Sequence, residues 1–377
     1  MNSNPSRIAY LDNLRILVTS LVVLHHTMIT YGAPGSWYFN DTAIQGVGQI
    51  LLTVFTALNS SFFMGFFFLL AGYFTPRSYD RKGPLIFVRD RVMRLGIPIA
   101  FYSFVVTPFI QAMLTVRVRN PGAAFWPTFA SELGNIGFAP GPLWFVTALL
   151  IFSFAYVLVR LVMSLRSDAP AQTARPLSSS QIALAGLAIG IATFLVRIVI
   201  PSGEEWFVFQ LGDFAQYIAL YAMGAVAYRG GWFETLTKKQ GKQWLWAAIG
   251  CAILLPVVGL LGGAFDGDPS EFLGGVRWES LIGSLWWSMQ GVAIIVTLLV
   301  RFRERLNHQG TLAREMARSA YTVYILHAPI VVGISLLLLF TGWHSAIKLP
   351  IACIAALGIC FSIASLVRRI PLARRVL

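Results

Sequence analysis

Ten long apolar runs dominate this sequence of 377 residues and decide what it can fold into. A helix that crosses a lipid bilayer needs about 20 predominantly apolar residues, and each run is close to that length. The runs predict an all-α fold: one polytopic membrane bundle of about ten transmembrane helices over residues 1–377, with no soluble appended domain. They cover residues 14–31, 50–74, 95–116, 143–163, 182–200, 209–228, 244–262, 281–300, 320–341 and 347–367.

The composition excludes a soluble or a disordered protein. Hydrophobic residues make up 56% of the chain and charged residues only 12%. A soluble domain carries roughly 25% charged residues, so this chain has too little polar material to cover a water-facing surface. Disordered chains are poor in the apolar and aromatic residues that abound here. The sequence therefore predicts a multi-pass integral membrane protein.

The formal net charge of +13 is explained by topology. With ten helices, 24 of the 29 lysines and arginines fall on one side of the membrane, near both termini and in the loops of that side. Cytoplasmic loops are enriched in lysine and arginine. We therefore expect both termini in the cytoplasm, and the basic excess requires no nucleic-acid partner. The five basic residues that fall on the opposite side of the membrane are Arg117, Arg119, Arg197, Arg277 and Lys348.

Several other features concern organisation rather than chemistry. The polar segment 164–180 is predicted to be a short cytoplasmic linker, and no internal repeat is visible. The sequence shows no metal-ligand spacing, so we expect no metal. Three cysteines lie inside apolar runs, which predicts buried thiols rather than disulfides: Cys251, Cys353 and Cys360. Four prolines inside or near the runs predict helix kinks: Pro98, Pro108, Pro256 and Pro329.

The first run carries the densest set of ionisable residues. Burying such residues in hydrocarbon costs roughly several kcal/mol, so they are functional candidates by default. Arg15 and His26 are eleven positions apart, which places them on one helix face about 16 Å apart along the axis, with His25 turned away by about 80°. We interpret Arg15 and His26 as catalytic, with Asp12 and His25 in an accompanying polar network. The alternative is that both histidines only bond neighbouring helices.

A second candidate site lies in the basic cytoplasmic stretch before the third run. Arg91 and Arg94 are three positions apart and share a helix face. We expect the third helix to begin here, so that its positive N-terminal end and the two guanidiniums favour phosphate groups. The alternative interpretation is an anchor that contacts lipid headgroups. The spacing alone does not decide between the two.

Two further segments supply candidates for a polar network. Tyr321, Tyr324 and His327 step by three along the ninth run and form a roughly contiguous stripe. The pattern fits either a functional network or simple cross-links between helices, and it slightly favours the cross-links. Trp144 opens the fourth run and is typical of an interfacial anchor.

Taken in order, these motifs resemble the membrane acyltransferase-3 family over essentially the whole chain. Arg15 followed by ten residues and His26 matches the family's Arg–x10–His signature, within an opening of the LDxLR type at 11–15. Further matches are FFFLLAGYF at 66–74, Arg–x–x–Arg at 91–94, GPLWF at 141–145 and YTVYILHAP at 321–329. RLGIP at 94–98 and RIPL at 369–372 look most like a succinyltransferase-type branch.

The resemblance implies an enzyme of the bacterial inner membrane. Such an enzyme takes an acyl group, acetyl or succinyl, from cytoplasmic acyl-CoA and transfers it to a hydroxyl of an envelope glycan or another periplasmic acceptor. Its implied partners are acyl-CoA, this acceptor and membrane lipid. Asp90 departs from the pattern, because many members carry a basic residue there. Many members also carry an esterase-type domain after the last helix, so a separate periplasmic acylating partner is compatible with this sequence.

The residues and the resemblance together give a mechanistic hypothesis. Arg91 and Arg94 hold the phosphates of acyl-CoA, its slender arm passes Arg15, and the thioester reaches His26. Neutral His26 then acts as general base toward the acceptor hydroxyl. The alternative function is a secondary transporter of an organic anion or lipid, since ten helices with ionisable residues near the membrane centre suit that as well. A purely structural membrane protein would leave the alignment of Arg15 and His26 unexplained.

Overall fold

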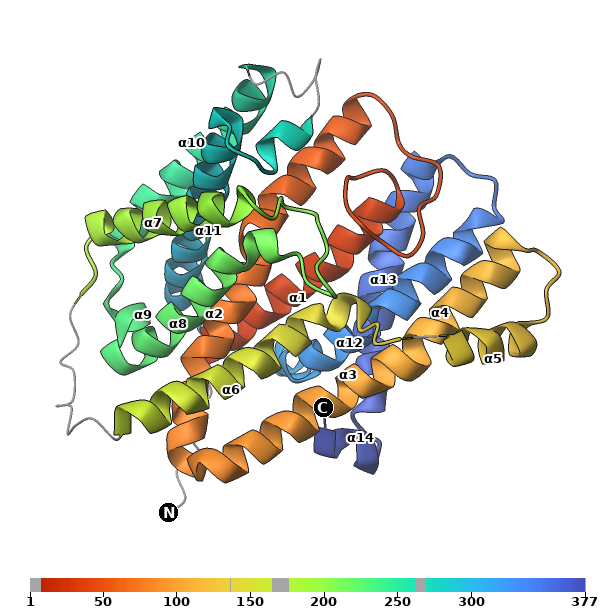
Figure 1. The fold of residues 1–377 in the computed structure, drawn as a ribbon, viewed down its shortest axis with the longest axis horizontal. Coiled ribbons are helices and arrows are strands. Elements are labelled where there is room, and N and C mark those ends of the chain that lie inside the picture. The colour runs from red at the N-terminus through yellow and green to blue at the C-terminus, as the bar shows by residue number, and fades with distance from the viewer. Residues whose placement is uncertain (1–7, 136, 165–175, 262–268, 377) are drawn as a thin grey trace. The chain divides into compact units, whose positions relative to one another are not determined.

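The structure is a computed structural model that describes residues 8–135, 137–164, 176–261 and 269–376 (Figure 1). Within these ranges all regular secondary structure is helical, apart from one isolated bridge between Trp206 and Phe209. The predicted all-α class is therefore confirmed. The longer helices are α1 (Ala9–Thr30), α2 (Val47–Arg91), α6 (Trp144–Ser164), α7 (Ser179–Arg197), α8 (Phe214–Gly230), α10 (Lys238–Leu261), α11 (Trp278–Arg305), α12 (Thr311–Leu339) and α13 (Ser345–Val367).

The shorter segments connect these helices. The α-helical ones are α3 (Ile97–Phe101), α4 (Thr107–Leu114), α5 (Phe125–Asn135), α9 (Trp232–Thr235) and α14 (Pro371–Val376). The π-helical ones are η1 (Val92–Gly96), η2 (Tyr102–Val106) and η3 (Thr115–Arg119). Short 3-10 turns form η4 (Gly141–Leu143), η5 (Leu211–Asp213) and η6 (Pro269–Phe272).

Six helical stretches in the described ranges are long and apolar enough to cross a bilayer, which makes the protein a multi-pass integral membrane protein. They are Val47–Arg119, Gly141–Met163, Ser179–Arg197, Trp278–Arg305, Thr311–Leu339 and Ser345–Val367. The first stretch contains two of the ten predicted runs. The runs at α1, α8 and α10 also form helices, although none of the three is among the six. The count of ten and the side of the termini stay predictions.

Some of the predicted features lie outside the described residues. Most of the linker at 164–180 does, since residues 165–175 are not described. Three of the basic residues used to orient the helices also lie outside the described residues, namely Arg7, Arg166 and Arg175.

One boundary prediction is wrong. We expected the third helix to begin at Arg91 and Arg94, but the backbone is helical from Val47 to Arg119 except at Gly83, where φ is 73° and ψ is 169°. The helix that carries the two arginines therefore restarts after Gly83, about two turns before Arg91. The positive end of the helix dipole acts within about one turn, so it does not reach these guanidiniums.

The prolines predicted to distort helices coincide in part with π-helical turns. η1 and η2 each end two residues before a proline, Pro98 and Pro108. Proline lacks the N–H that would bond back to the preceding turn, and a wider π turn is one local adjustment that accommodates this loss. Pro256 and Pro329 lie inside α10 and α12, which continue past them.

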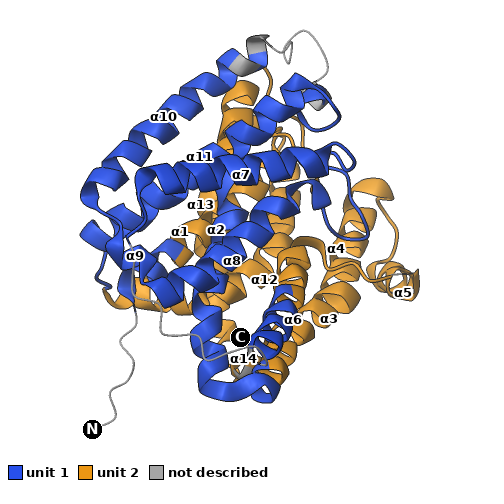
Figure 2. Cartoon of the chain, turned by 60° about the vertical axis from the view of Figure 1, so that its left-hand side comes forward, with its two compact units in different colours: residues 1–14, 60–87, 152–309 blue, residues 15–59, 88–151, 310–377 orange. Residues whose placement is uncertain are grey.

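The chain forms two compact units whose segments alternate along the sequence (Figure 2). The first unit comprises residues 1–14, 60–87 and 152–309. In it α11 packs along α7 and α10, and α2 crosses α8 at two glycines. A Cβ on Gly72 would lie 2.0 Å from the carbonyl oxygen of Tyr221, and one on Gly224 would lie 2.1 Å from that of Leu69. Glycine permits this close backbone approach, which is common between membrane helices.

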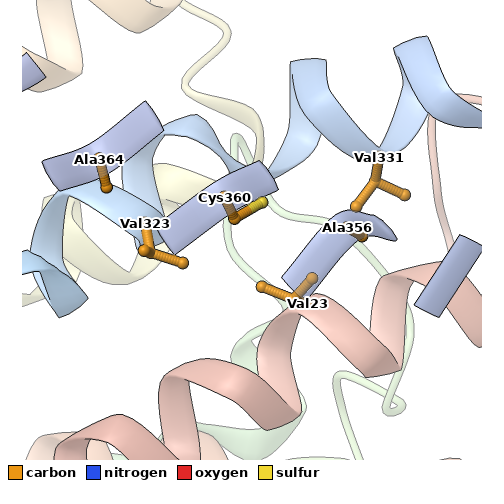
Figure 3. Packing of buried hydrophobic residues seen from close by; sticks show 6 residues of the cluster. All are labelled: Val23, Val323, Val331, Ala356, Cys360 and Ala364. Atoms are coloured by element: carbon orange, nitrogen blue, oxygen red, sulfur yellow. The ribbon is translucent and has the colours of Figure 1, made fainter. Parts of the chain in front are cut away.

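The second unit comprises residues 15–59, 88–151 and 310–377, and it contains the candidate site. In its core α12 packs along α13, and a cluster of small buried side chains joins these helices to α1 (Figure 3). Val23 of α1 meets Val323 and Val331 of α12 there, one turn before or after the histidines of interest. The packing of small residues thus fixes the register of α1 against α12. The α13 members of the cluster are Ala356, Cys360 and Ala364.

Candidate active site

Two histidines from distant parts of the sequence meet in the second unit. Nε2 of His327 on α12 lies 3.1 Å from Nδ1 of His26 on α1, and the two ring centroids are 5.0 Å apart. His327 is completely buried, whereas His26 is only partly buried. His26 is therefore the member of the pair that a substrate can approach.

The hydrogen bonds of the pair fix the tautomers when both rings are neutral. Nδ1 of His327 lies 2.6 Å from the carbonyl oxygen of Tyr324. A carbonyl oxygen only accepts, so this Nδ1 carries the proton and Nε2 of His327 is the acceptor for His26. Nδ1 of His26 then donates, which leaves the lone pair on Nε2 of His26. This chain from carbonyl to His327 to His26 orients His26 and presents an unprotonated nitrogen, as a general base requires.

The indole of Trp37 covers the imidazole of His26. Their ring centroids are 4.0 Å apart with an interplanar angle of 18°, and Trp37 also stacks near His327 at 6.0 Å. The Nε1–H of Trp37 is buried and has no hydrogen-bond partner among the described residues. Leaving such a donor unsatisfied costs about 1–3 kcal/mol. Sequence reasoning missed Trp37, although its place in a Pro- and Gly-containing loop directly after the histidine helix was a usable signal.

A buried ion pair holds the loop that carries Trp37. Nζ of Lys348 on α13 lies 2.8 Å from Oδ2 of Asp41, and both side chains are at most 5% exposed. Ser345 Oγ donates to the carbonyl of Thr42 at 2.6 Å, and the N–H of Asp41 donates to the carbonyl of Thr30 at 2.8 Å. The loop between α1 and α2 is thus fastened at its far end, and the position of Trp37 over His26 is fixed.

His25 faces a different neighbour, as the helical angle predicts. Its Nδ1 accepts from Nδ2 of Asn59 on α2 at 3.2 Å, and the His25 ring is buried. His25 therefore bonds a neighbouring helix, whereas His26 faces α12 and the loop. Asn59 was not singled out from the sequence. Asp12 is buried in the first turn of α1, in the part of this helix that belongs to the first unit.

The stripe on α12 connects the histidine pair with two of the sequence motifs. Tyr321 donates through its hydroxyl to the carbonyl of Arg94 at 2.7 Å. Tyr324 donates to the carbonyl of Pro142, two residues before Trp144. Tyr321 and His327 are six positions apart, which is about 9 Å along the helix. The two tyrosines therefore cross-link helical segments, and the stripe leads from Arg94 to His26.

The GPLWF motif has a local steric role beside this stripe. Gly141 has φ +49°, and a Cβ there would lie 2.0 Å from the hydroxyl oxygen of Tyr38. Only glycine fits both the left-handed backbone and this close approach. Tyr38 follows Trp37 in the loop, and its hydroxyl lies 3.5 Å from that of Tyr102 in η2. The glycine of the motif therefore makes room for the loop over His26, and Trp144 stands half-buried at the start of α6.

The remaining candidates lie on the same unit but are not in the cluster. Arg15 is half-buried on α1, the helix that also carries His26, as expected. Arg91 is partly exposed at the end of α2 and Arg94 is exposed in η1. Arg94 is connected to the site through the bond from Tyr321 to its backbone. The structure thus joins His26, His327 and Tyr324 directly and joins the arginine motif through α12.

Comparisons with known proteins agree with the motifs. The family model of the acyltransferase domain, acyltransferase-3, matches residues 8–365. Glucans biosynthesis protein C of Salmonella schwarzengrund is 24% identical over 238 residues, which are 60% of this chain and 60% of that relative. The protein of the same name from Escherichia coli O17:K52:H18 is 22% identical over 350 residues, 88% of this chain and 84% of the relative. No solved structure matches the chain. Because the family model covers nearly the whole sequence, the chain belongs to the acyltransferase-3 family and is a membrane-embedded transferase enzyme.

Proposed function

We propose that this enzyme moves an acyl group, acetyl or succinyl, from cytoplasmic acyl-CoA to a hydroxyl of a periplasmic glucan or related envelope glycan at the bacterial inner membrane. The observation that carries the proposal is the hydrogen bond between Nδ1 of His26 and Nε2 of His327. This bond leaves Nε2 of His26 unprotonated, and His26 is the less buried of the two histidines. The name of the relatives supports a glucan as the acceptor.

The proposed chemistry needs one proton carrier. Nε2 of His26 takes the proton of the acceptor hydroxyl while the oxygen attacks the thioester carbonyl, which forms a C–O bond and a tetrahedral oxyanion. The C–S bond then breaks, and the CoA sulfur leaves with the proton held by His26. His327 accepts from Nδ1 of His26 throughout and stabilises the imidazolium, since a hydrogen bond to a charged group is stronger than a neutral one.

The position of acyl-CoA follows from the stripe on α12. In our proposal Arg91 and Arg94 bind its phosphates, because guanidinium groups match phosphate geometry. Tyr321 lies against Arg94, and His327 is about 9 Å further along the same helix. The slender arm of CoA, running beside this stripe and Arg15, carries the thioester to His26. A dipole contribution from a helix N-terminus is not part of the proposal.

Trp37 supplies the donor that the oxyanion needs. Its Nε1–H is buried beside His26 without a partner among the described residues, and a thioester oxygen at that place would satisfy it. Trp37→Phe keeps the stacked ring but removes the donor. The loss of one oxyanion donor typically costs about 100- to 1,000-fold in kcat, so this variant should bind acyl-CoA normally and turn over slowly. A kcat of Trp37→Phe equal to that of the wild type would show that Trp37 does not stabilise the oxyanion.

The chain belongs to a family of transferases, which favours an enzyme over a secondary transporter or a purely structural membrane protein. The deciding experiment combines cells and purified protein. Envelope glycans from cells with and without the protein are compared by mass spectrometry, and the purified enzyme is given acetyl-CoA or succinyl-CoA with glucan in detergent. We expect one acyl ester that appears only with the protein, and free CoA release that His26→Gln abolishes. Unchanged glycans together with no CoA release from either donor would refute the proposal.

A further inference from the structure

An apolar pocket of about 840 Å³ lies in the second unit. It is bounded by α4, η3 and the start of α5 on one side and by the last turns of α12 on the other. Ligand pockets typically measure about 300–1,000 Å³, so its size suits an organic ligand. Its walls include Met113, Phe125 and Leu336, and its lining residues include neither histidine of the pair nor Trp37.

One charged residue lines this pocket in the described part of the chain. It is Arg117, whose guanidinium carbon lies 5.9 Å from the ring centre of Phe340, another lining residue. Gly333 lines the pocket from α12, and a Cβ built on it meets no atom within 4 Å. The site therefore combines a cation with a long apolar wall that is open at Gly333.

The charge of Arg117 also lacks a carboxylate partner among the described residues. Arg117 belongs to the five basic residues that the charge pattern leaves on the side opposite the basic loops. Three of these five pair with carboxylates: Arg197 with Asp213, Arg277 with Glu271, and Lys348 with Asp41. Arg119 instead donates to the amide oxygen of Gln111 at 2.9 Å. Of these five described residues, Arg117 is the one that lines this apolar pocket.

We propose that this pocket binds one anionic phospholipid, with an acyl chain along its apolar wall and the headgroup phosphate on Arg117. Charge complementarity selects an anionic rather than a zwitterionic lipid, because a basic residue near a membrane surface attracts anionic headgroups. The apolar lining selects an amphiphile rather than free phosphate. The acyl chain of the bound lipid fills the pocket and contacts its apolar walls.

Native mass spectrometry of the full-length protein tests the proposal. The purified protein is titrated with phosphatidylglycerol and with phosphatidylcholine of identical acyl chains. We expect one phosphatidylglycerol to be retained at concentrations where phosphatidylcholine is not. Arg117→Gln should weaken this retention about fivefold, which corresponds to the ~1 kcal/mol typical of a basic residue near an anionic surface.

Matched variants separate the two parts of the site. Arg119→Gln removes a guanidinium two residues away that does not line the pocket, so retention should stay as in the wild type. Gly333→Leu fills the pocket and should abolish retention, while Gly358→Leu adds the same side chain at an open glycine on α13 and should leave it unchanged. Unfolding temperatures close to that of the wild type confirm that each variant is folded.

Three outcomes would overturn the proposal. Equal retention of the two lipids would exclude the headgroup contact, and equal losses in the two arginine variants would indicate general charge attraction only. Normal retention in Gly333→Leu would show that the chain lies elsewhere. The proposed acyl transfer is independent of all three results, because the pocket and the histidine cluster share no residue.

Discussion

Replacing His327 tests whether it acts through His26. His327 is completely buried and accepts the hydrogen bond from Nδ1 of His26 at 3.1 Å. In the proposed reaction His26 becomes an imidazolium, and a hydrogen bond to a charged group contributes about 1.5–3 kcal/mol. At 1.36 kcal/mol for each tenfold change in rate, His327→Leu should lower kcat about 10- to 150-fold. The loss of the base itself costs about 100- to 10,000-fold.

The choice of substituent makes this prediction specific. The amide oxygen of glutamine can take the place of Nε2 and accept from His26, so His327→Gln should stay within about tenfold of the wild type. Leucine offers no acceptor. Release of the CoA thiol from acyl-CoA in detergent gives kcat and KM for each variant. We expect the change to fall on kcat, because His327 is buried and its ring nitrogens bond to His26 and to the carbonyl of Tyr324.

A double variant provides the strictest check. If His327 acts only by orienting and stabilising His26, then adding His327→Leu to His26→Ala should cost nothing further, since residues that act as a unit are not additive. Losses that multiply in the double variant would contradict this role of His327. Equal slowing by glutamine and leucine at position 327 would contradict it as well, because the hydrogen-bond acceptor would then be irrelevant.

The other predictions concern the base, the donor site and the topology. His26→Ala should abolish acyl transfer and leave CoA binding unchanged, whereas His25→Ala should reduce acyl transfer less. Normal turnover in His26→Gln together with no turnover in His25→Gln would show that His25 is the base. Replacing Arg91 and Arg94 together by Ala should weaken CoA binding measured by calorimetry, while Arg89→Ala, an exposed arginine in the same basic stretch, should not. Cysteine labelling should place the loop between α11 and α12 in the cytoplasm, and labelling from outside would invert the topology.

Helical periodicity was enough to predict which way each histidine points. A step of about 100° per residue separates His25 from His26, and the structure places them against different neighbours, Asn59 and His327. The pairing of His26 with His327 was not predictable from spacing, because the two residues lie 301 positions apart. The sequence placed His327 only in a stripe of possible cross-links. Its partner depends on how α12 packs against α1, and small residues such as Val23 and Val323 determine that packing.

The wrong helix start at Arg91 has a physical reason as well. Gly96 and Pro98 interrupt the apolar pattern, and such residues commonly mark a boundary. In this chain π-helical turns absorb the interruption, so the helix continues through it. The true break is Gly83, whose φ of 73° suits glycine. A glycine next to Pro84 in a polar stretch was the stronger signal.

Trp37 shows why loop residues at a site escape periodicity. No repeat of side chains indicates where a loop residue points, and the position of Trp37 depends on contacts far from it in sequence. Lys348 is one of them, and in the charge pattern it was only an exception. Its charge is buried against Asp41, and removing one partner of such a pair typically costs about 3–5 kcal/mol. The pair therefore ties the loop over His26 to α13, which makes an apparent anomaly of the charge pattern part of what holds the site together.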